Sequence, residues 1–334
     1  MKKLSKAIAI ITAGALMLTG CSSNASESST ENKSDITKIK IGITQIVDHP
    51  ALNAARDGFI ERLKELGLDA DISIQDAQGD VANAQMIAEK FVSDKSDLIL
   101  AIATPTAQAA QNATKDSKTP VIFTAVSDPV FSGLVANKEK PEANVTGVTD
   151  EVSNENLKEI MNILKELKPD IKTLGIVYNT SESNSQVQIE NVEKVSSEMG
   201  IKVEAVGIAS INEINQALES VSKKSQALML INDNMIASSM ELVSKIAKEK
   251  GLITISAVSS FVDDGSLISV GISYKELGRQ AADMAAKILN DKTPINEVPV
   301  ESSNVFIKKV NKTTLKALGL DEKHKAFEGE EIVE

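Results

Sequence analysis

The chain has 334 residues, of which 42% are hydrophobic and 25% charged, enough for two domains of roughly 100 to 150 residues each. Aromatic residues make up only 3%, with no tryptophan, so a core must consist mainly of aliphatic side chains. The net charge is −11, and it becomes −14 (33 minus 47) without residues 1–20, which hold three lysines and no acid. Because so acidic a chain repels nucleic acid and anionic lipid headgroups, neither is expected as a partner.

The N-terminus predicts a targeting signal. Three lysines precede an apolar stretch, 7–18, that is too short to span a bilayer. The letters LTGC follow and end at Cys21, the only cysteine, and they resemble the lipobox of bacterial lipoproteins, in which that cysteine bears the lipid. We therefore expect a signal peptide over 1–20 and lipidation of Cys21. Residues 21–38 are rich in serine and lack periodicity, which is typical of a flexible tether.

Strands and helices alternate from there. Residues 39–44 alternate as a β-strand does, and 51–66 follow a helical period that stops at Gly67. Further strands are predicted at 72–75, 97–103 and 121–126, and further helices at 80–92 and 104–114. Strands separated by helices favour a parallel, doubly wound α/β sheet.

A second series of elements repeats the first. KTLGIVYN (172–179) echoes IKIGITQI (39–46), SKKSQALMLIND (222–233) echoes SDKSDLILAIAT (93–104), and SAVSS (256–260) echoes TAVSD (124–128). The three matches keep one order and are shifted by 133, 129 and 132 residues. They indicate an internal duplication, and hence two similar α/β lobes with parallel sheets.

The last part of the chain departs from this repetition. We expect a strand at 267–271, a helix at 274–289 and a late strand at 305–310. A chain that crosses between lobes more than once makes a hinge of several strands. The predicted N-terminal lobe comprises 39–149 plus 273–293, and the C-terminal lobe 150–272 plus 294–320, with 321–334 as a solvated tail.

Polar loops follow the predicted strands of both lobes. Open α/β proteins bind ligands at the carboxyl ends of parallel strands, where helix N-termini expose their amides. The loops at these ends are 45–50, 104–106 and 127–129 in the first lobe and 180–185, 233–234 and 259–260 in the second. If the lobes face each other, these loops enclose a small polar molecule.

Five sequence blocks carry a resemblance to a known family. They are GITQIVDHPALNAARDGF, AQGDVANAQMIAEKFVSDKSDLILAIATPTAQAA, FTAVSDPV, NVTGVTD and LGRQAADMA. These blocks are similar to those of substrate-binding lipoproteins of bacterial ABC importers with the type I periplasmic-binding-protein fold, in the subfamily linked to tryptophan and other aromatic amino acids. The resemblance implies a protein outside the cytoplasm, anchored to the cell membrane by lipid, that closes on an amino acid and delivers it to a permease and its ATPase. We expect it to be a monomer.

The resemblance also implies ligand contacts at matching positions. Thr104 and Thr106 begin a predicted helix, where their hydroxyls and amides are expected to hold a carboxylate. Asp128 and Asp233 are the candidates to pair with an ammonium group. Ser273 is a further candidate, at a position where we expect an acidic residue in many relatives.

Seven further loop residues complete the predicted ligand-binding set: Gln45, His49, Ser127, Asn184, Ser185, Asn234 and Ser259. His49 has no second histidine or cysteine nearby, so no metal site is expected there, and an exposed loop histidine is the alternative. Asp128, Asp233 and Thr104 are also favourable helix caps, a role compatible with binding.

Catalysis finds little support in the sequence. There is no Gly-x-Ser-x-Gly elbow, no phosphate loop and no Gly-x-Gly-x-x-Gly after the first strand, so neither enzymatic activity nor a cofactor is expected. Two alternatives to amino-acid capture stay open. The same fold could bind a sugar, a nucleoside or another small solute, whose hydroxyls would suit Asp128, Asn184 and Asp233, or the protein could be a surface sensor that presents its closed form to a receptor.

Overall fold

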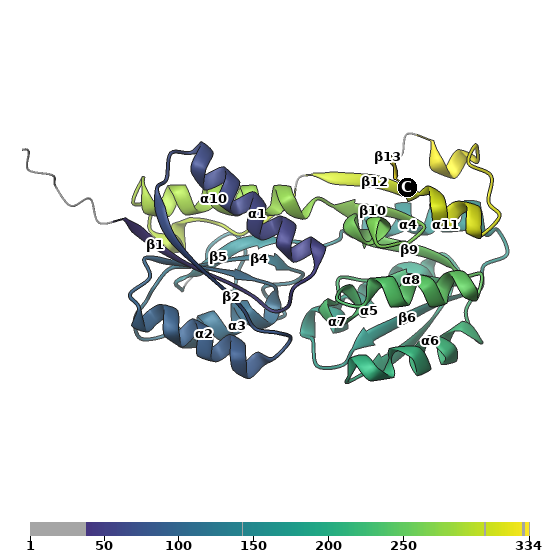
Figure 1. Cartoon of the computed structure of the whole chain (residues 1–334), viewed down its shortest axis with the longest axis horizontal. Coiled ribbons are helices and arrows are strands. Elements are labelled where there is room, and N and C mark those ends of the chain that lie inside the picture. Colours follow the sequence, from purple (N-terminus) through teal and green to yellow (C-terminus); the bar gives the residue numbers. More distant parts are fainter. Residues whose placement is uncertain (1–37, 142, 304, 329–330, 334) are drawn as a thin grey trace, which may run out of the picture. The chain divides into compact units, whose positions relative to one another are not determined.

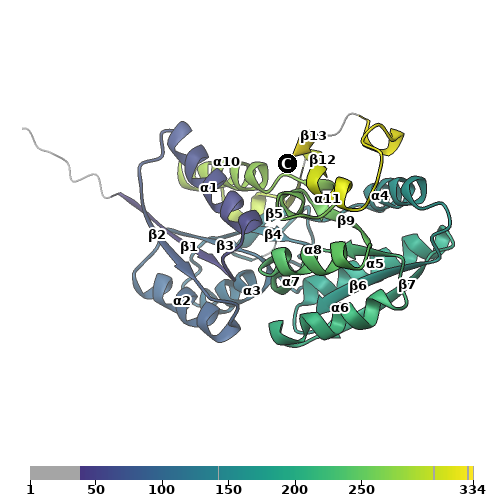
Figure 2. The same cartoon turned by 45° about the vertical axis from the view of Figure 1, so that its right-hand side comes forward.

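The computed structural model describes residues 38–334 except 142, 304, 329, 330 and 334 (Figures 1 and 2). The predicted signal peptide, Cys21 and the tether up to residue 37 lie outside the described residues. In the described part the chain forms two sheets with helices between the strands, as the alternating pattern predicts.

The first sheet is parallel throughout and has the strand order β11-β5-β4-β3-β1-β2. Its strands are β1 (Ile39–Gln45), β2 (Ala70–Asp76), β3 (Leu98–Ile102), β4 (Val121–Val126), β5 (Val145–Thr149) and β11 (Glu301–Ser302). The central strands β3, β4 and β5 are buried on both faces, which explains the mainly apolar runs of β3 and β4.

The second sheet repeats this plan in the order β13-β12-β10-β9-β8-β6-β7. Its strands are β6 (Thr173–Asn179), β7 (Lys202–Ile208), β8 (Ala227–Leu230), β9 (Ile253–Val258), β10 (Ile268–Ile272), β12 (Phe306–Asn311) and β13 (Glu331–Val333). Strands β6 to β10 occupy the same places in this sheet as β1 to β5 do in the first. The duplication predicted from the sequence is confirmed by this correspondence. Only β12 runs antiparallel to its neighbour β10 among the paired strands described.

Helices flank both sheets. Beside the first lie α1 (Pro50–Glu65), α2 (Val81–Ser93), α3 (Thr104–Ala113) and α10 (Tyr274–Leu289). The helices beside the second sheet are α4 (Asn154–Leu167), α5 (Ser183–Glu198), α6 (Ile214–Ser222), α7 (Asn234–Ala237), α8 (Met240–Glu249), α9 (Ser260–Asp263) and α11 (Lys312–Ala317). In both views α1 and α10 cover one face of the first sheet and α2 and α3 the other, which is the doubly wound arrangement (Figures 1 and 2).

Helix α10 belongs to the first lobe although it follows β10 of the second. It packs tightly on α1 because two glycines lie where the helices cross. A Cβ added to Gly278 would lie 1.8 Å from the Ala55 carbonyl oxygen, and one added to Gly58 would lie 2.2 Å from the Lys275 carbonyl oxygen. The chain thus passes between the sheets after β5, after β10 and after β11, which gives the predicted hinge of several segments.

Two expectations about the end of the chain need correction. Residues 294–302 were assigned to the C-terminal lobe, but β11 pairs with Val148 and Thr149 and extends the first sheet. A strand of two residues has no periodicity that a sequence could reveal. The tail was expected to be solvated, yet Ala326 and Phe327 are buried in the apolar core of the second lobe. The lobe boundaries as a whole stay a prediction.

Candidate functional site

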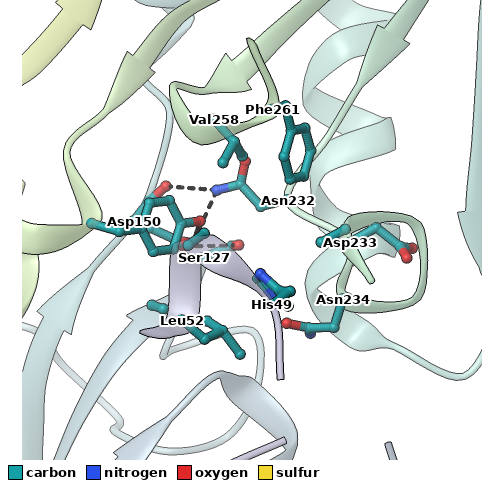
Figure 3. Close-up of a pocket in the computed structure, with 13 residues that line it drawn as sticks. His49, Leu52, Ser127, Asp150, Asn232, Asp233, Asn234, Val258 and Phe261 are labelled. Atoms are coloured by element: carbon teal, nitrogen blue, oxygen red, sulfur yellow. Dashed lines mark hydrogen bonds between the residues drawn. The ribbon is translucent and has the colours of Figure 1, made fainter. Parts of the chain in front are cut away.

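A cavity lies at the carboxyl ends of strands from both sheets (Figure 3). The first lobe contributes His49, Ala51, Leu52, Ala125, Ser127, Asp150 and Tyr274, and the second contributes Asn232, Asp233, Asn234, Ala237, Val258 and Phe261. About 300 Å³ of space that no protein atom fills lies along these side chains, and part of it is open to solvent. Only about 20 Å³ of it can hold the centre of a water molecule, which is room for roughly one or two waters.

Asp150, the residue after β5, is the centre of the hydrogen bonding in this cavity. Its Oδ1 accepts a hydrogen bond from the Ser127 hydroxyl at 3.0 Å, and its Oδ2 accepts from Asn232 Nδ2 at 2.9 Å and from the Tyr274 hydroxyl at 2.6 Å. Asp150 extends the first sheet, since its N–H donates to the carbonyl of Val126, although the predicted boundary puts it in the C-terminal lobe. Asn232 follows β8 of the second sheet, so its bond to Asp150 joins the two lobes. A second bond between the lobes runs from Gln188 Nε2 on α5 to the Ser127 hydroxyl, at 3.2 Å.

The Asp150 carboxylate has no cationic partner among the described residues. It is 2% exposed, and burial raises its pKa although the donors Tyr274, Asn232 and Ser127 oppose the shift. Burial and the neighbouring carboxylate raise the pKa of Tyr274 well above its ordinary value. Among the described residues that line the cavity there is no lysine or arginine. A cationic group of a ligand would therefore be stabilised here.

Asp233 also reaches the cavity, but its oxygens are occupied by its own lobe. Oδ1 accepts from the N–H of Ile236 at 2.9 Å, which caps α7, and Oδ2 accepts from the N–H of Asn179 at 2.6 Å and from the Ser185 hydroxyl at 2.7 Å. Burial, and then repulsion from Glu182, raise the pKa of Asp233 to about 7. These contacts give Asp233 the capping role that the sequence also allowed.

His49 is buried, not exposed as the alternative interpretation had it. The ring is 6% exposed and lines the cavity, and the Asn234 side chain lies beside it, but neither Nδ1 nor Nε2 makes a well-aligned hydrogen bond with the described residues. Burial lowers the pKa of His49 to about 4, while Asn234 and Asp48 favour the protonated form more weakly. At neutral pH the ring is therefore uncharged and offers the cavity one N–H donor and one nitrogen acceptor.

The end of β4 is irregular where it borders the cavity. Ala125 has φ 58, in the left-handed region that favours glycine, and the pairing of β4 with β5 shifts register between Thr124 and Val126. Bulges and strained backbone of this kind concentrate beside functional sites. The irregularity places Ala125 and Ser127 on the cavity wall.

Four of the twelve predicted ligand-binding residues line this cavity: His49, Ser127, Asp233 and Asn234. The other eight lie outside its lining: Gln45, Thr104, Thr106, Asp128, Asn184, Ser185, Ser259 and Ser273. Two of these eight support the wall from behind, because Ser185 bonds to Asp233 and Asn184 Nδ2 donates to the carbonyl of Asn232 at 2.9 Å.

The hydrogen bonds of the remaining six stay within one lobe. Asp128 accepts from the backbone N–H groups two and three residues on, and Ser273 caps α10. The Thr106 hydroxyl donates to carbonyls of the preceding turn, and that of Ser259 donates to the end of β10. Gln45 bonds to neighbouring polar side chains. Only the Thr104 hydroxyl, among these six, is buried without a partner in the described residues.

Sequence reasoning missed the residue at the centre of the site. Asp150 ends the NVTGVTD block and directly follows β5, but the short strand VTGVT was not recognised because it carries two threonines and a glycine. Asn232 was missed beside the predicted Asp233. The signal that could have found Asp150 was its place as the last residue of the NVTGVTD block, one of the blocks that carry the family resemblance.

Within the described ranges no group of three or more His, Cys, Asp or Glu side chains is arranged to hold a metal ion. In the same part of the chain no helix has the length and apolar character needed to cross a membrane.

Known proteins with similar sequences share this architecture. The family model of ABC transporter substrate-binding proteins matches residues 40–326. The tyrosine-binding protein of Clostridioides difficile strain R20291 is 43% identical over 330 residues, which are 96% of this chain and 94% of that protein.

Solved structures extend the comparison. A domain from Streptococcus pneumonia in complex with L-Trp is 29% identical, with a TM-score of 0.83 over 89% of this chain and 100% of that one. The ligand-free, open structure of a substrate-binding protein from Clostridium difficile is 45% identical, with a TM-score of 0.67 over 88% of this chain and 99% of that one. The resemblance in the sequence blocks is thereby confirmed. Because the family model covers most of the chain and the close relatives are matched almost end to end, the chain belongs to the ABC transporter substrate-binding proteins, which bind a solute outside the cytoplasm.

Proposed function

We propose that this protein captures an amino acid with an aromatic side chain, tyrosine or tryptophan, and delivers it to the permease and ATPase of an ABC importer. The observation that carries the proposal is the 43% identity, over nearly the whole chain, to a protein named for tyrosine binding. The complex of a further relative with L-Trp supports the same class of ligand.

The chemistry of the cavity suits such a ligand. The buried Asp150 carboxylate lacks a cation, and Asn232 Oδ1 next to it is buried without a hydrogen-bond donor among the described residues. A ligand ammonium group would pair with both oxygens. Leu52, Val258 and Phe261 supply the apolar surface that an aromatic ring needs.

Closure of the lobes fits the capture step. The bonds of Asp150 and Ser127 to the opposite lobe leave space for one or two waters, so a ligand enters only after these bonds break. The structure is also more similar to the L-Trp complex than to the ligand-free, open relative, although the open relative is the more similar in sequence. A ligand that contacts both lobes favours the closed form because the open form lacks half of its contacts.

The proposal includes an anchor at the cell membrane. Cys21 follows a signal-like segment and would carry the lipid, and the serine-rich residues 22–37 would let the two-lobed body stand away from the membrane as a monomer. A single lipid chain gives only weak membrane binding, whereas the several chains of a bacterial lipoprotein hold it firmly.

A binding screen tests the proposed ligand class. Calorimetry of the full chain against the twenty amino acids, glucose, ribose and adenosine should give tight binding for tyrosine or tryptophan. Affinity for a sugar or nucleoside together with no response to any amino acid would refute the proposal.

A further inference from the structure

Among the described residues that line the cavity, His49 is a buried polar side chain in which neither polar atom makes a well-aligned hydrogen bond, whereas in Asn232 only Oδ1 lacks one. Asp150 and Asp233 both have protein donors, and Asn232 Nδ2 is bonded to Asp150. The two nitrogens of His49, by contrast, make no well-aligned hydrogen bond with the described residues, although the ring is 6% exposed and the Asn234 side chain lies beside it. A buried polar atom without a partner costs roughly 1–3 kcal/mol. The ring is therefore placed for a group that arrives with the ligand.

His49 enters the cavity from a different strand end than the groups that would take the ammonium. It comes from the loop after β1, whereas Asp150 follows β5, and β3 and β4 lie between these two strands in the sheet. Three strand spacings separate β1 from β5, about 14 Å at the usual 4.7–4.9 Å per spacing. Figure 3 shows the His49 ring next to the Asn234 side chain and apart from the Asp150–Asn232 pair. A ligand held at Asp150 would thus extend its side chain toward His49.

We propose that His49 determines ligand specificity by hydrogen-bonding a polar group at the far end of an aromatic side chain, so that tyrosine binds in preference to phenylalanine. This inference rests on the proposed capture of an aromatic amino acid. A phenol hydroxyl can both donate and accept, so it fits either tautomer of the neutral ring, and an indole N–H fits the unprotonated nitrogen. Phenylalanine would leave the ring nitrogens buried and unpaired, as they are in the empty cavity.

The expected discrimination follows from the cost of those unpaired atoms. At 1–3 kcal/mol, with 1.4 kcal/mol for each factor of ten, tyrosine should bind roughly 5- to 150-fold more tightly than phenylalanine. Sites built to bond a ligand hydroxyl reject the analogue that lacks it far better than apolar pockets separate ligands by size. A nonpolar ring in place of His49 should remove this preference.

The test compares the ratio of two affinities in three proteins. Calorimetry measures the Kd of L-tyrosine and L-phenylalanine for the full chain, for His49→Phe and for His49→Gln. We expect the ratio of the tyrosine affinity to the phenylalanine affinity to fall close to one in His49→Phe. In His49→Gln, which retains a donor and an acceptor, part of the preference for tyrosine should remain. The control is His324→Phe, the same substitution near the C-terminus at a residue outside the cavity, which should keep the wild-type ratio.

Three results would overturn the inference, and each differs from a failure of the proposed function. The wild-type protein could bind both amino acids equally, or His49→Phe could retain the wild-type ratio. His49→Phe could also lower the affinity for both ligands to the same extent, which would indicate that the ring contacts the carboxylate that both ligands share. If instead the wild-type protein binds no amino acid, it is the proposed function that fails. Should His49→Phe not fold, as circular dichroism would show, the ratio in His49→Gln and in His49→Leu decides.

Discussion

Replacing Asp150 with asparagine should separate ligand binding from stability. The side chain keeps its shape, its oxygen can still accept from Tyr274 and Asn232, and its new amide can donate to the Ser127 hydroxyl, so the three hydrogen bonds of the empty site are retained. What the substitution removes is the negative charge. Loss of one partner from a buried charge pair costs about 2–5 kcal/mol, so we expect the affinity for an aromatic amino acid to fall roughly 30- to 3,000-fold.

The stability of the empty protein should move in the opposite direction. Burial raises the pKa of Asp150, which means that folding disfavours its ionised form. The stability that protonated Asp150 contributes is therefore present below the pKa of the unfolded chain and is lost as the pH rises through the higher pKa of the folded protein. Asparagine does not ionise, so the variant does not lose this stability at pH 7. We expect the melting temperature of the empty variant, measured by differential scanning fluorimetry, to equal or exceed that of the wild type.

Asp128 in the same lobe offers a matched control outside the cavity lining. Asp128→Asn makes the same chemical change in a residue that caps its own turn and does not line the cavity. Its ligand affinity, measured by calorimetry with L-tyrosine, should stay within about threefold of the wild type, since its bonds remain in one lobe. The reasoning fails if Asp150→Asn binds as the wild type does, or if Asp128→Asn weakens binding as much as Asp150→Asn.

Three further outcomes can be checked. Gly278→Ala should lower the free energy of unfolding in urea by about 1–3 kcal/mol despite its better helix propensity, because the new methyl group would meet the Ala55 carbonyl oxygen at 1.8 Å; unchanged stability would show that α1 and α10 separate freely. Because the pKa of His49 is about 4 when folded and about 6.5 when unfolded, its contribution is complete above pH 6.5 and is lost toward pH 4. Between pH 6.5 and 5 the free energy of unfolding in urea should therefore fall by about 2 kcal/mol less in His49→Gln than in the wild type. Equal decreases in the two proteins would contradict the lowered pKa of His49. Cys21→Ser should move the protein from the membrane fraction to the soluble fraction of its native host, and retention at the membrane would exclude anchoring through this residue.

Much of the architecture could be predicted from periodicity alone. The central strands of a parallel sheet are buried on both faces, so β3 and β4 appear in the sequence as short, mainly apolar runs, and the helices between the strands carry one apolar stripe. The three echoed segments predicted a second lobe of the same plan, and the matching strand orders confirm it. These features depend on local patterns, which is why the sequence contains them.

The sequence by itself determined the two-lobed α/β plan, the ends of the strands where a ligand should bind, and the family. Only the tertiary structure decided which polar residues at those ends face each other. Along the chain, Asn232 lies 82 residues and Tyr274 lies 124 residues from Asp150, so no local pattern connects the three. Likewise Asp128 and Asp233 are alike in sequence, each an acid after a strand, and only their surroundings show that both are held by backbone N–H groups of their own turns. The physical reason is that burial and hydrogen-bond partners belong to the assembled lobes, whereas propensity and period belong to each segment.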